Sequence, residues 1–263
     1  MSVEFSQESE RSHVGHLRID FNELNLLSEP AATELQTALA SVPEEVAVLT
    51  IAADRSGEDG EEIRGLTAGL DLEWARDLSP HEGRDLLETL YETIQAVRDL
   101  DAVTVCGCGS YTLGAGLELA MACELRVATE DANLGLPEVD VGLPTVIHGG
   151  LLIPMVGLGT ATELIYTGET VSGTRARELG LVNRAVPPAE YDATMDELVD
   201  TLAEKSPLVM QLQKQVMRRF RFSGLEAGMA ATSSDIARSF GSHDQREAMD
   251  AFLEDRKPVF EGR

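Results

Sequence analysis

The sequence predicts an α/β fold with parallel strands, followed by a C-terminal region built of helices. Residues 46–52 and 102–108 are short, nearly continuous apolar runs, which is typical of strands buried on both faces of a sheet. Between these two runs, residues 81–100 carry apolar side chains at helical spacing. From residue 189 onwards the pattern is helical, with few strand signals. Strands that alternate with helices over the first two-thirds of the chain favour parallel pairing, and the last third then forms a helical appendage.

The individual elements follow from local patterns in chain order. Residues 16–21 alternate between apolar and polar side chains, which predicts a strand, and residues 30–42 place apolar side chains on one helical face. After the strand at 46–52, residues 55–62 are acidic and contain glycine, which predicts an exposed loop. The remaining elements are the helix at 81–100, the strand at 102–108, a helix at 117–124, a strand at 125–128, short helices at 161–166 and 174–178, and a strand at 181–186.

The charge balance is strongly acidic. The 263 residues contain 46 acids and 21 bases, for a formal net charge of −25. Such a charge repels the phosphate backbone of nucleic acids, so we expect no nucleic-acid partner. It also disfavours the compact state at low salt, and salt screens this repulsion within about 10 Å at 0.1 M and about 3 Å at 1 M. The composition therefore favours adaptation to high intracellular salt, as in a halophile, and an ordinary acidic protein is the alternative.

The cysteine count and the N-terminal residues bear on location. The chain contains three cysteines, Cys106, Cys108 and Cys123. This low and odd number favours a protein of the reducing cytoplasm over one held together by disulfide bonds. Three cysteines are too few for a zinc site, so we expect no metal and assign them to buried positions. The first ten residues, MSVEFSQESE, do not have the pattern of a signal peptide, and no stretch of 18 uncharged apolar residues predicts a membrane span. We expect a cytoplasmic protein.

Two segments rich in small residues, GLTAGLD at 65–71 and TLGAGLE at 112–118, contain few side chains that could take part in a reaction. We propose that they supply backbone N–H groups, two of which converge on one substrate carbonyl. Gly114, Ala115 and Gly116 precede a predicted helix, and a helix that starts in small residues presents free N–H groups and a partial positive charge. Such an end suits an anion, a phosphate or an oxygen that becomes negative during a reaction. Tight packing of helix on strand is the alternative.

A nicotinamide or flavin cofactor is not expected. Gly107 and Gly109, like Gly114 and Gly116, give only the first half of a G-x-G-x-x-G fingerprint. The third glycine is missing in both cases, which makes a dinucleotide-binding site improbable.

Two glutamates stand out because their neighbours are apolar. Glu118 lies in the first turns of the helix at 117–124, and Glu138 lies in GLPEVDVGLP. A carboxylate in an apolar segment needs a partner or a purpose, and two together could hold a water and share acid and base duties. The alternative is a pair of structural glutamates bonded to backbone N–H groups. His148 is a lone histidine in an apolar stretch, which is more typical of a packed residue, and Asp71 is most simply a helix cap.

Taken together, these segments resemble the crotonase superfamily, in particular the enoyl-CoA hydratases. The resemblance implies a spiral of ββα repeats over residues 1–190, closed by a helical trimerisation region over residues 191–263. It also implies an acyl-CoA substrate, no cofactor beyond the coenzyme A of that substrate, and a homotrimer or a dimer of trimers. The matching phrases are FNELN (21–25), AGLD (68–71), YTLGAGLELAMACELRVA (111–128), LGLPEVDVGLP (134–144), YTGETVSGTRARELGLVNRAV (166–186) and FLEDRKPVF (252–260).

The resemblance also implies roles for individual residues. The two oxyanion-hole N–H donors of the family correspond to Leu70 and Ala115, and the two glutamates of its hydratases correspond to Glu118 and Glu138. The presence of both glutamates favours syn addition of water across the 2,3 double bond of a 2-enoyl-CoA. Residues expected to contact coenzyme A or the acyl group are Arg64, Ala68, Gly69, Asp71, Gly114 and Lys257.

The chain departs from the family pattern in three places. Ala115 stands where the family usually has glycine, so a methyl group faces the site and could narrow the substrate range. Glu73 stands where family members often have a lysine for a coenzyme A phosphate. The loop after Pro144 reads TVIHGG instead of a glycine-rich sequence, which makes His148 a candidate for lining the pocket.

Three functions are consistent with the sequence. The first is an enoyl-CoA hydratase. The second is a sibling reaction on the same scaffold, such as double-bond isomerisation, which could use a single carboxylate, or dehydration of a special hydroxyacyl-CoA. The third is a non-catalytic CoA-ester-binding protein. The position of the two glutamates relative to the N–H donors discriminates the first from the third.

Overall fold

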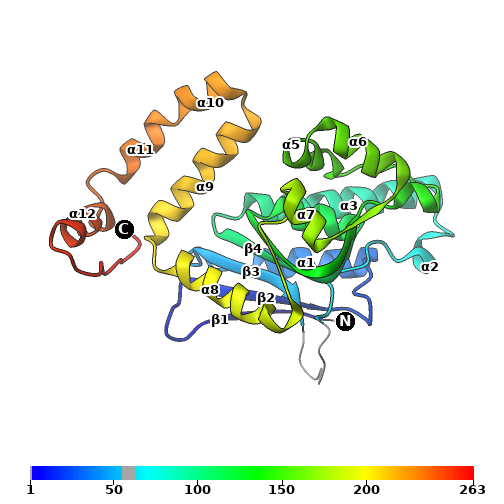
Figure 1. Ribbon diagram of the computed structural model, residues 1–263, viewed down its shortest axis with the longest axis horizontal. Coiled ribbons are helices and arrows are strands. Elements are labelled where there is room, and N and C mark those ends of the chain that lie inside the picture. Colours follow the sequence, from blue (N-terminus) through cyan, green and yellow to red (C-terminus); the bar gives the residue numbers. More distant parts are fainter. Residues whose placement is uncertain (1, 55–62) are drawn as a thin grey trace.

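The computed structural model describes residues 2–54 and 63–263, so the loop expected at 55–62 lies outside the described residues. A single seven-stranded sheet forms the centre, in the order β1-β2-β3-β4-β5-β6, with β7 paired to β5 (Figure 1). Strands β2, β3, β4 and β5 are parallel, β1 is antiparallel to β2, and β6 is antiparallel to β5. The strands are β1 (Ser2–Gln7), β2 (Val14–Asp20), β3 (Val48–Ala53), β4 (Val103–Leu113), β5 (Leu125–Gly135), β6 (Thr170–Ser172) and β7 (Arg184–Val186).

Helices cover both faces of the sheet. The larger core cluster joins the sheet to α1, α3 and α4 on one face, and α8 packs on the opposite face. The helices are α1 (Glu29–Ala40), α2 (Leu72–Ala75), α3 (Pro80–Asp99), α4 (Ala115–Ala122), α5 (Leu152–Val156), α6 (Leu158–Thr167), α7 (Gly173–Leu179), α8 (Tyr191–Ala203), α9 (Pro207–Phe222), α10 (Leu225–Ala231), α11 (Ser233–Ser239) and α12 (His243–Leu253). Single turns of 3₁₀ helix are η1 (Glu138–Val141), η2 (Gly149–Leu151) and η3 (Pro188–Glu190).

The apolar run in β3 shows why a strand covered on both faces loses its alternation. All six residues of β3 are buried. Leu49 and Ile51 belong to the core cluster that includes α1 and α3, whereas Val48 packs against Val199 of α8. Because neither face meets water, both sets of side chains are apolar.

Serine caps explain where the two long N-terminal helices begin. The Ser28 side chain accepts a hydrogen bond from the Ala31 N–H ahead of α1. Ser79 and Glu82 form a reciprocal capping box at the start of α3. A proline in the first turn of each helix fits the same position, because its missing N–H is not needed there.

The predicted α/β fold with parallel strands and C-terminal helices is confirmed. The strand β4 is longer than expected because its register shifts near Gly109, where φ is +63°, and pairing with β5 then continues to Leu113. The predicted strand at 181–186 starts only at Arg184, because Leu181 and Val182 donate hydrogen bonds back to Ala176 at the end of α7. The short elements β1, β6, α2 and α5 were not predicted. The edge strand β1 has no fully buried side chain, so it lacks an apolar signal.

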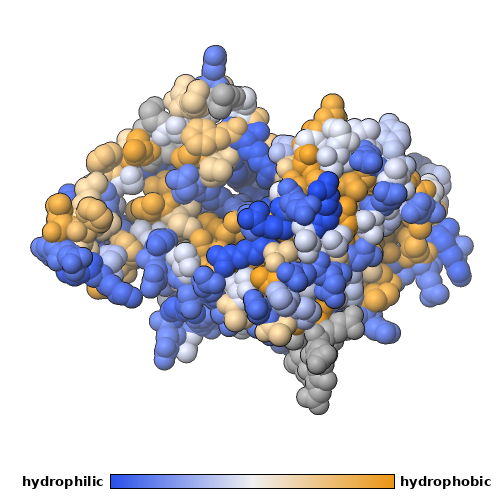
Figure 2. Space-filling model, in the orientation of Figure 1, coloured by the Kyte–Doolittle hydropathy of each residue, from blue (hydrophilic) through white to orange (hydrophobic). Residues whose placement is uncertain are grey.

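The C-terminal helices α9 to α12 extend from the end of the sheet as an arm, with α10 and α11 running back along α9 (Figure 1). Figure 2 shows apolar side chains gathered on this arm. The division expected near residue 190 stays a prediction, and α8, which follows that point, packs on the sheet. No helix within the described ranges is long and apolar enough to cross a membrane. Exposed large apolar side chains of α9 to α11 include Val209, Met217, Phe220, Phe222, Met229 and Ile236, and Phe240 directly follows α11.

Candidate active site

The two segments rich in small residues meet, as predicted. Thr67 and Thr112 form a parallel bridge, and the Leu113 N–H donates to the Thr67 carbonyl oxygen at 3.0 Å. A Cβ atom added to Gly69 would lie 2.9 Å from the Leu113 carbonyl oxygen and 3.6 Å from the Gly114 Cα. Only glycine permits this approach of the two backbones.

Each expected N–H donor follows a glycine in the left-handed region, with φ of +93° at Gly69 and +54° at Gly114. Leu27 forms a parallel bridge with Leu70: its N–H donates to the Gly69 carbonyl oxygen, and its carbonyl oxygen accepts from the Asp71 N–H. This bridge does not use the Leu70 N–H. Ala115 is the first residue of α4, where backbone N–H groups have no partner within the helix. Among the residues the structure describes, neither N–H has a hydrogen-bond partner. Both are therefore available to an oxygen atom of a ligand.

A cavity of about 240 Å³ opens beside these N–H groups. It is lined by Leu70 and Ala115, by both Glu118 and Glu138, and by apolar side chains of α2, α3 and the loop at 137–147. Ala68, Gly69 and Gly114 also line it. The sequence-predicted donors and carboxylates thus share one largely apolar cavity.

Glu118 is buried in α4, with 2% of its surface exposed. Burial, together with the charge of Glu138, raises the pKa of Glu118 to about 8, while the backbone amides of Gly149 and His148 act in the opposite direction. Within the described part of the chain, the Glu118 Oε1 atom has no hydrogen-bond partner. One oxygen of this carboxyl group is therefore left without a partner, and the neutral form is favoured at neutral pH.

Glu138 starts the turn η1 and is half-buried. The Thr145 hydroxyl donates a hydrogen bond to Glu138 Oε2 at 2.9 Å. The other carboxylate oxygen faces the donor segment, since a Cβ atom at Gly114 would lie 3.3 Å from Glu138 Oε1. Neither Glu118 nor Glu138 forms an ion pair with a described residue, so both are available for chemistry in the cavity.

The altered loop after Pro144 places its residues differently from the expectation. His148 does not line the cavity, whereas its neighbour Ile147 does. The imidazole is 4% exposed, stacks on the Tyr91 ring at 4.9 Å, and lies 3.3 Å from Gln95 Oε1 through Nε2. Burial, together with the charge of Arg98, lowers the pKa of His148 to about 4, so the ring is neutral at neutral pH. His148 is thus a packed residue, which was the simpler of its two interpretations.

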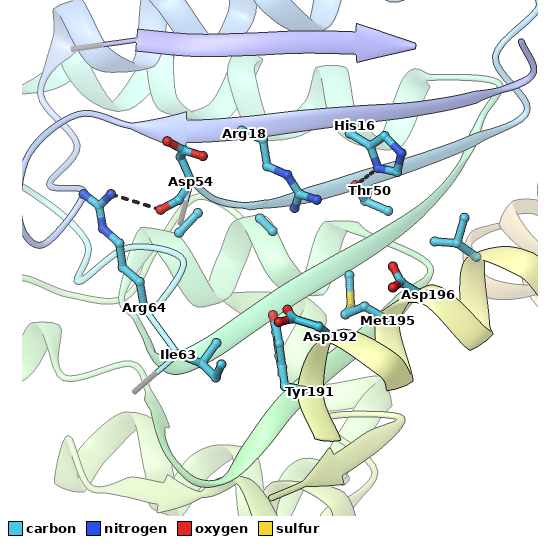
Figure 3. A pocket seen from close by; sticks show the side chains of 13 residues that line it. His16, Arg18, Thr50, Asp54, Ile63, Arg64, Tyr191, Asp192, Met195 and Asp196 are labelled. Atoms are coloured by element: carbon cyan, nitrogen blue, oxygen red, sulfur yellow. Dashed lines mark hydrogen bonds between the residues drawn. The ribbon is translucent and has the colours of Figure 1, made fainter. Parts of the chain in front are cut away.

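Arg64, an expected contact of coenzyme A, lies in a different cavity of about 320 Å³ between the sheet and α8 (Figure 3). Its guanidinium donates to Asp20 Oδ1 at 2.9 Å and to Asn25 Oδ1 at 3.0 Å. It also donates to the Asp54 carbonyl oxygen at 3.3 Å, as Figure 3 shows. Both signs of charge meet in this second cavity, which gives it no clear preference for an anion. Its arginine and aspartate residues are Arg18, Arg64, Asp54, Asp192 and Asp196.

Asp71 and Lys257 also lie outside the active-site cavity. Asp71 caps α2, accepting a hydrogen bond from the Trp74 N–H at 3.1 Å, which is the role that helix-capping chemistry predicts. Lys257 is exposed near the C-terminus and lies 3.4 Å from Glu204.

Two residues that support the site were not identified from the sequence. Asn25 is fully buried with φ of +52°, and its amide donates to the Leu66 carbonyl oxygen at 3.1 Å, which ties FNELN to the segment leading to Leu70. An asparagine near a turn is a weak signal for this role. Thr145 holds Glu138, but no regular spacing links two loop residues seven positions apart.

Comparisons with known proteins agree with this geometry. The family model described as Enoyl-CoA hydratase/isomerase matches residues 10–263. The chain is 29% identical over 236 residues to the Short-chain-enoyl-CoA hydratase of Clostridium acetobutylicum, covering 89% of this chain and 88% of that protein. It is 33% identical to the Probable enoyl-CoA hydratase of Bacillus subtilis, covering 90% and 91%. The crystal structure of the Enoyl-CoA Hydratase from Bacillus anthracis superimposes with a TM-score of 0.91 at 26% identity, covering 100% of both chains.

Proposed function

Because this chain belongs to the enoyl-CoA hydratase/isomerase family, we propose that it is an enoyl-CoA hydratase that adds water across the 2,3 double bond of a 2-enoyl-CoA. The observation that carries the proposal is the shared cavity, in which the free N–H groups of Leu70 and Ala115 stand beside Glu118 and Glu138. A protein that only bound CoA esters would have no need for a buried carboxylic acid whose oxygen lacks a partner.

The thioester oxygen of the substrate binds at the N–H groups of Leu70 and Ala115. When water attacks the β-carbon, negative charge develops on this oxygen, giving an enolate. Two fixed donors at a helix start stabilise that charge without reorganisation. Losing one such donor commonly costs about 3–4 kcal/mol of transition-state stabilisation.

The two carboxyl groups act as a pair. In the free protein the pair holds a proton at neutral pH, and burial favours that proton on Glu118. Addition of water needs a base that accepts a proton from the water and an acid that delivers one to the α-carbon. A pair with one proton provides both, and delivery from one side of the double bond gives syn addition.

The remaining parts of the proposal concern ligands and assembly. The substrate carries its own coenzyme A, so the reaction is proposed to need no cofactor. The exposed apolar side chains of the arm in Figure 2 support assembly of several copies through this arm, and the homotrimer or dimer of trimers is what the resemblance to the family implies. The net charge of −25 supports a cytoplasm of high salt content and no nucleic-acid partner.

Hydration of crotonyl-CoA, followed by the loss of enoyl absorbance in molar KCl, tests the proposal. We expect activity in the wild type that falls by orders of magnitude in both Glu118→Gln and Glu138→Gln. Glu163→Gln, at an exposed position of α6, is the matched control and retains activity. Absence of hydration in the folded wild type would overturn the proposal. Loss in Glu118→Gln alone, together with movement of the double bond, would identify an isomerase.

A further inference from the structure

The turn formed by residues 146–149 has an unusual residue at its first central position. The Gly149 N–H donates to the Val146 carbonyl oxygen at 2.8 Å, which closes the turn. Ile147 has φ of +44°, and His148 has φ of −111° with ψ of 10°. These angles have the signs of a type II′ turn, in which the first central residue is normally glycine. A β-branched residue at positive φ is strained, and such strain persists only where the surroundings enforce it.

The two residues that follow Ile147 hold the turn in place. His148 is held by its stack on Tyr91 and by Gln95. Gly149 packs against Glu118 and Thr145: a Cβ atom there would lie 3.1 Å from Glu118 Oε1 and 2.3 Å from Thr145 Cγ2. The backbone at Ile147 therefore cannot relax to negative φ without moving groups that touch Glu118.

The strained conformation determines which side chain meets the cavity. Ile147 lines it, partly buried against the main core cluster. Leu90, another apolar lining residue, is 2% exposed. Leu70 lines the cavity as well and is also partly buried against that cluster. The remaining large aliphatic residues of the lining are between 39% and 48% exposed and so stand nearer the mouth: Leu72, Leu87, Val141, Leu143 and Val146. Leu70, Leu90 and Ile147 are thus the more buried aliphatic residues of the lining and, with the buried Glu118, they mark the inner part of the cavity.

We propose that Ile147 is a specificity-determining residue that limits the length of the acyl chain. The identity of the ligand rests on the proposed function. The Ile147 side chain faces the acyl group from a backbone conformation that glycine would adopt without strain. Ile147 therefore lowers the stability of the folded protein while it closes the pocket. The chain with Ile147 favours short 2-enoyl groups, and removal of this side chain opens space for several further methylene groups.

The test compares Ile147→Gly with Ile147→Ala, which both remove the side chain, although only glycine relieves the backbone. For each variant, kcat/KM is measured with a ten-carbon 2-enoyl-CoA and with crotonyl-CoA. We expect the ratio of the first value to the second to rise at least about tenfold, because one methylene group in a pocket changes selectivity by about 10- to 200-fold. Ile147→Gly should melt about 2–4 °C above Ile147→Ala. The matched pair at Val146, a lining residue without positive φ, should show the usual order, with glycine below alanine.

Binding of the saturated butyryl-CoA and decanoyl-CoA, measured by calorimetry, separates this inference from the proposed function. If the wild type does not hydrate any enoyl-CoA, the hydratase proposal fails, and a preference for decanoyl-CoA that appears only in the Ile147 variants still supports the inference. An unchanged length preference in hydration and in binding would overturn it. An Ile147→Gly protein that melts below Ile147→Ala would overturn the strain argument on which it depends.

Discussion

Replacing Glu118 by glutamine is expected to stabilise the folded protein at alkaline pH while it abolishes hydration. The residue is 2% exposed in α4, and burial raises its pKa to about 8 from an ordinary value of 4.5. The folded protein therefore binds the Glu118 proton more tightly than the unfolded chain does. Stabilising the protein by removing a catalytic group would be a direct sign that the site is maintained at a cost in stability.

The magnitude follows from proton linkage. Below about pH 4.5 the carboxyl is protonated in both states, and the wild type loses nothing. As the pH rises from 4.5 to about 8, the unfolded state ionises while the folded state keeps its proton, so stability falls by about 1.4 kcal/mol per pH unit. The wild type thus loses about 5 kcal/mol of stability in total, a loss that Glu118→Gln avoids. The buried glutamine amide without a partner costs the variant about 1–3 kcal/mol. The net gain of Glu118→Gln above pH 8 is then about 2–4 kcal/mol.

Denaturant unfolding in molar KCl at about pH 5 and about pH 8.5 measures this gain. At about pH 5 only a little under 1 kcal/mol of the linkage effect has developed, so Glu118→Gln should be less stable than the wild type by up to about 2 kcal/mol, whereas at about pH 8.5 it should be more stable by about 2–4 kcal/mol. Glu163→Gln, on the exposed face of α6, controls for the loss of one negative charge and should show no such dependence. An advantage that is equal at both pH values, or absent at the higher one, would refute the raised pKa of Glu118.

Three further predictions concern the supports of the site and the surface charge. Thr145→Val removes the hydroxyl that donates a hydrogen bond to Glu138. Because a hydrogen bond to a charged group contributes about 1.5–3 kcal/mol, we expect kcat to fall about 10- to 100-fold. A kcat within twofold of the wild type would contradict this role. Gly69→Ala places a Cβ at φ of +93° and 2.9 Å from a carbonyl oxygen, so it should cost about 1–3 kcal/mol in unfolding experiments and lower kcat by displacing the Leu70 N–H. Gly83→Ala, at an open helical position, is its control and should add about 0.5–1 kcal/mol. Activity and melting temperature should rise from low to molar KCl, because salt screens a net charge of −25, and a flat response would contradict adaptation to salt.

Much of the fold and part of the site follow from local patterns. The apolar runs of β3 and β4 predict buried strands because both faces of the sheet are covered. Glu118 and Glu138 stand out because an ionisable group among apolar residues is costly unless it has a use. The convergence of the segments around Leu70 and Ala115 was proposed from their small residues, and the residue roles came from the resemblance.

Only the tertiary structure decided what the loops do. The sequence marked His148, yet Ile147 faces the cavity, because a stack on Tyr91, 57 positions earlier in the chain, turns the imidazole away. Arg64 is engaged by Asp20 and Asn25 rather than directed to the cavity. Side chains in helices and strands point where the 3.6- and 2-residue periods direct them, so their burial can be predicted from the sequence. A loop side chain has no such period, and its direction depends on contacts that form only when distant segments pack together.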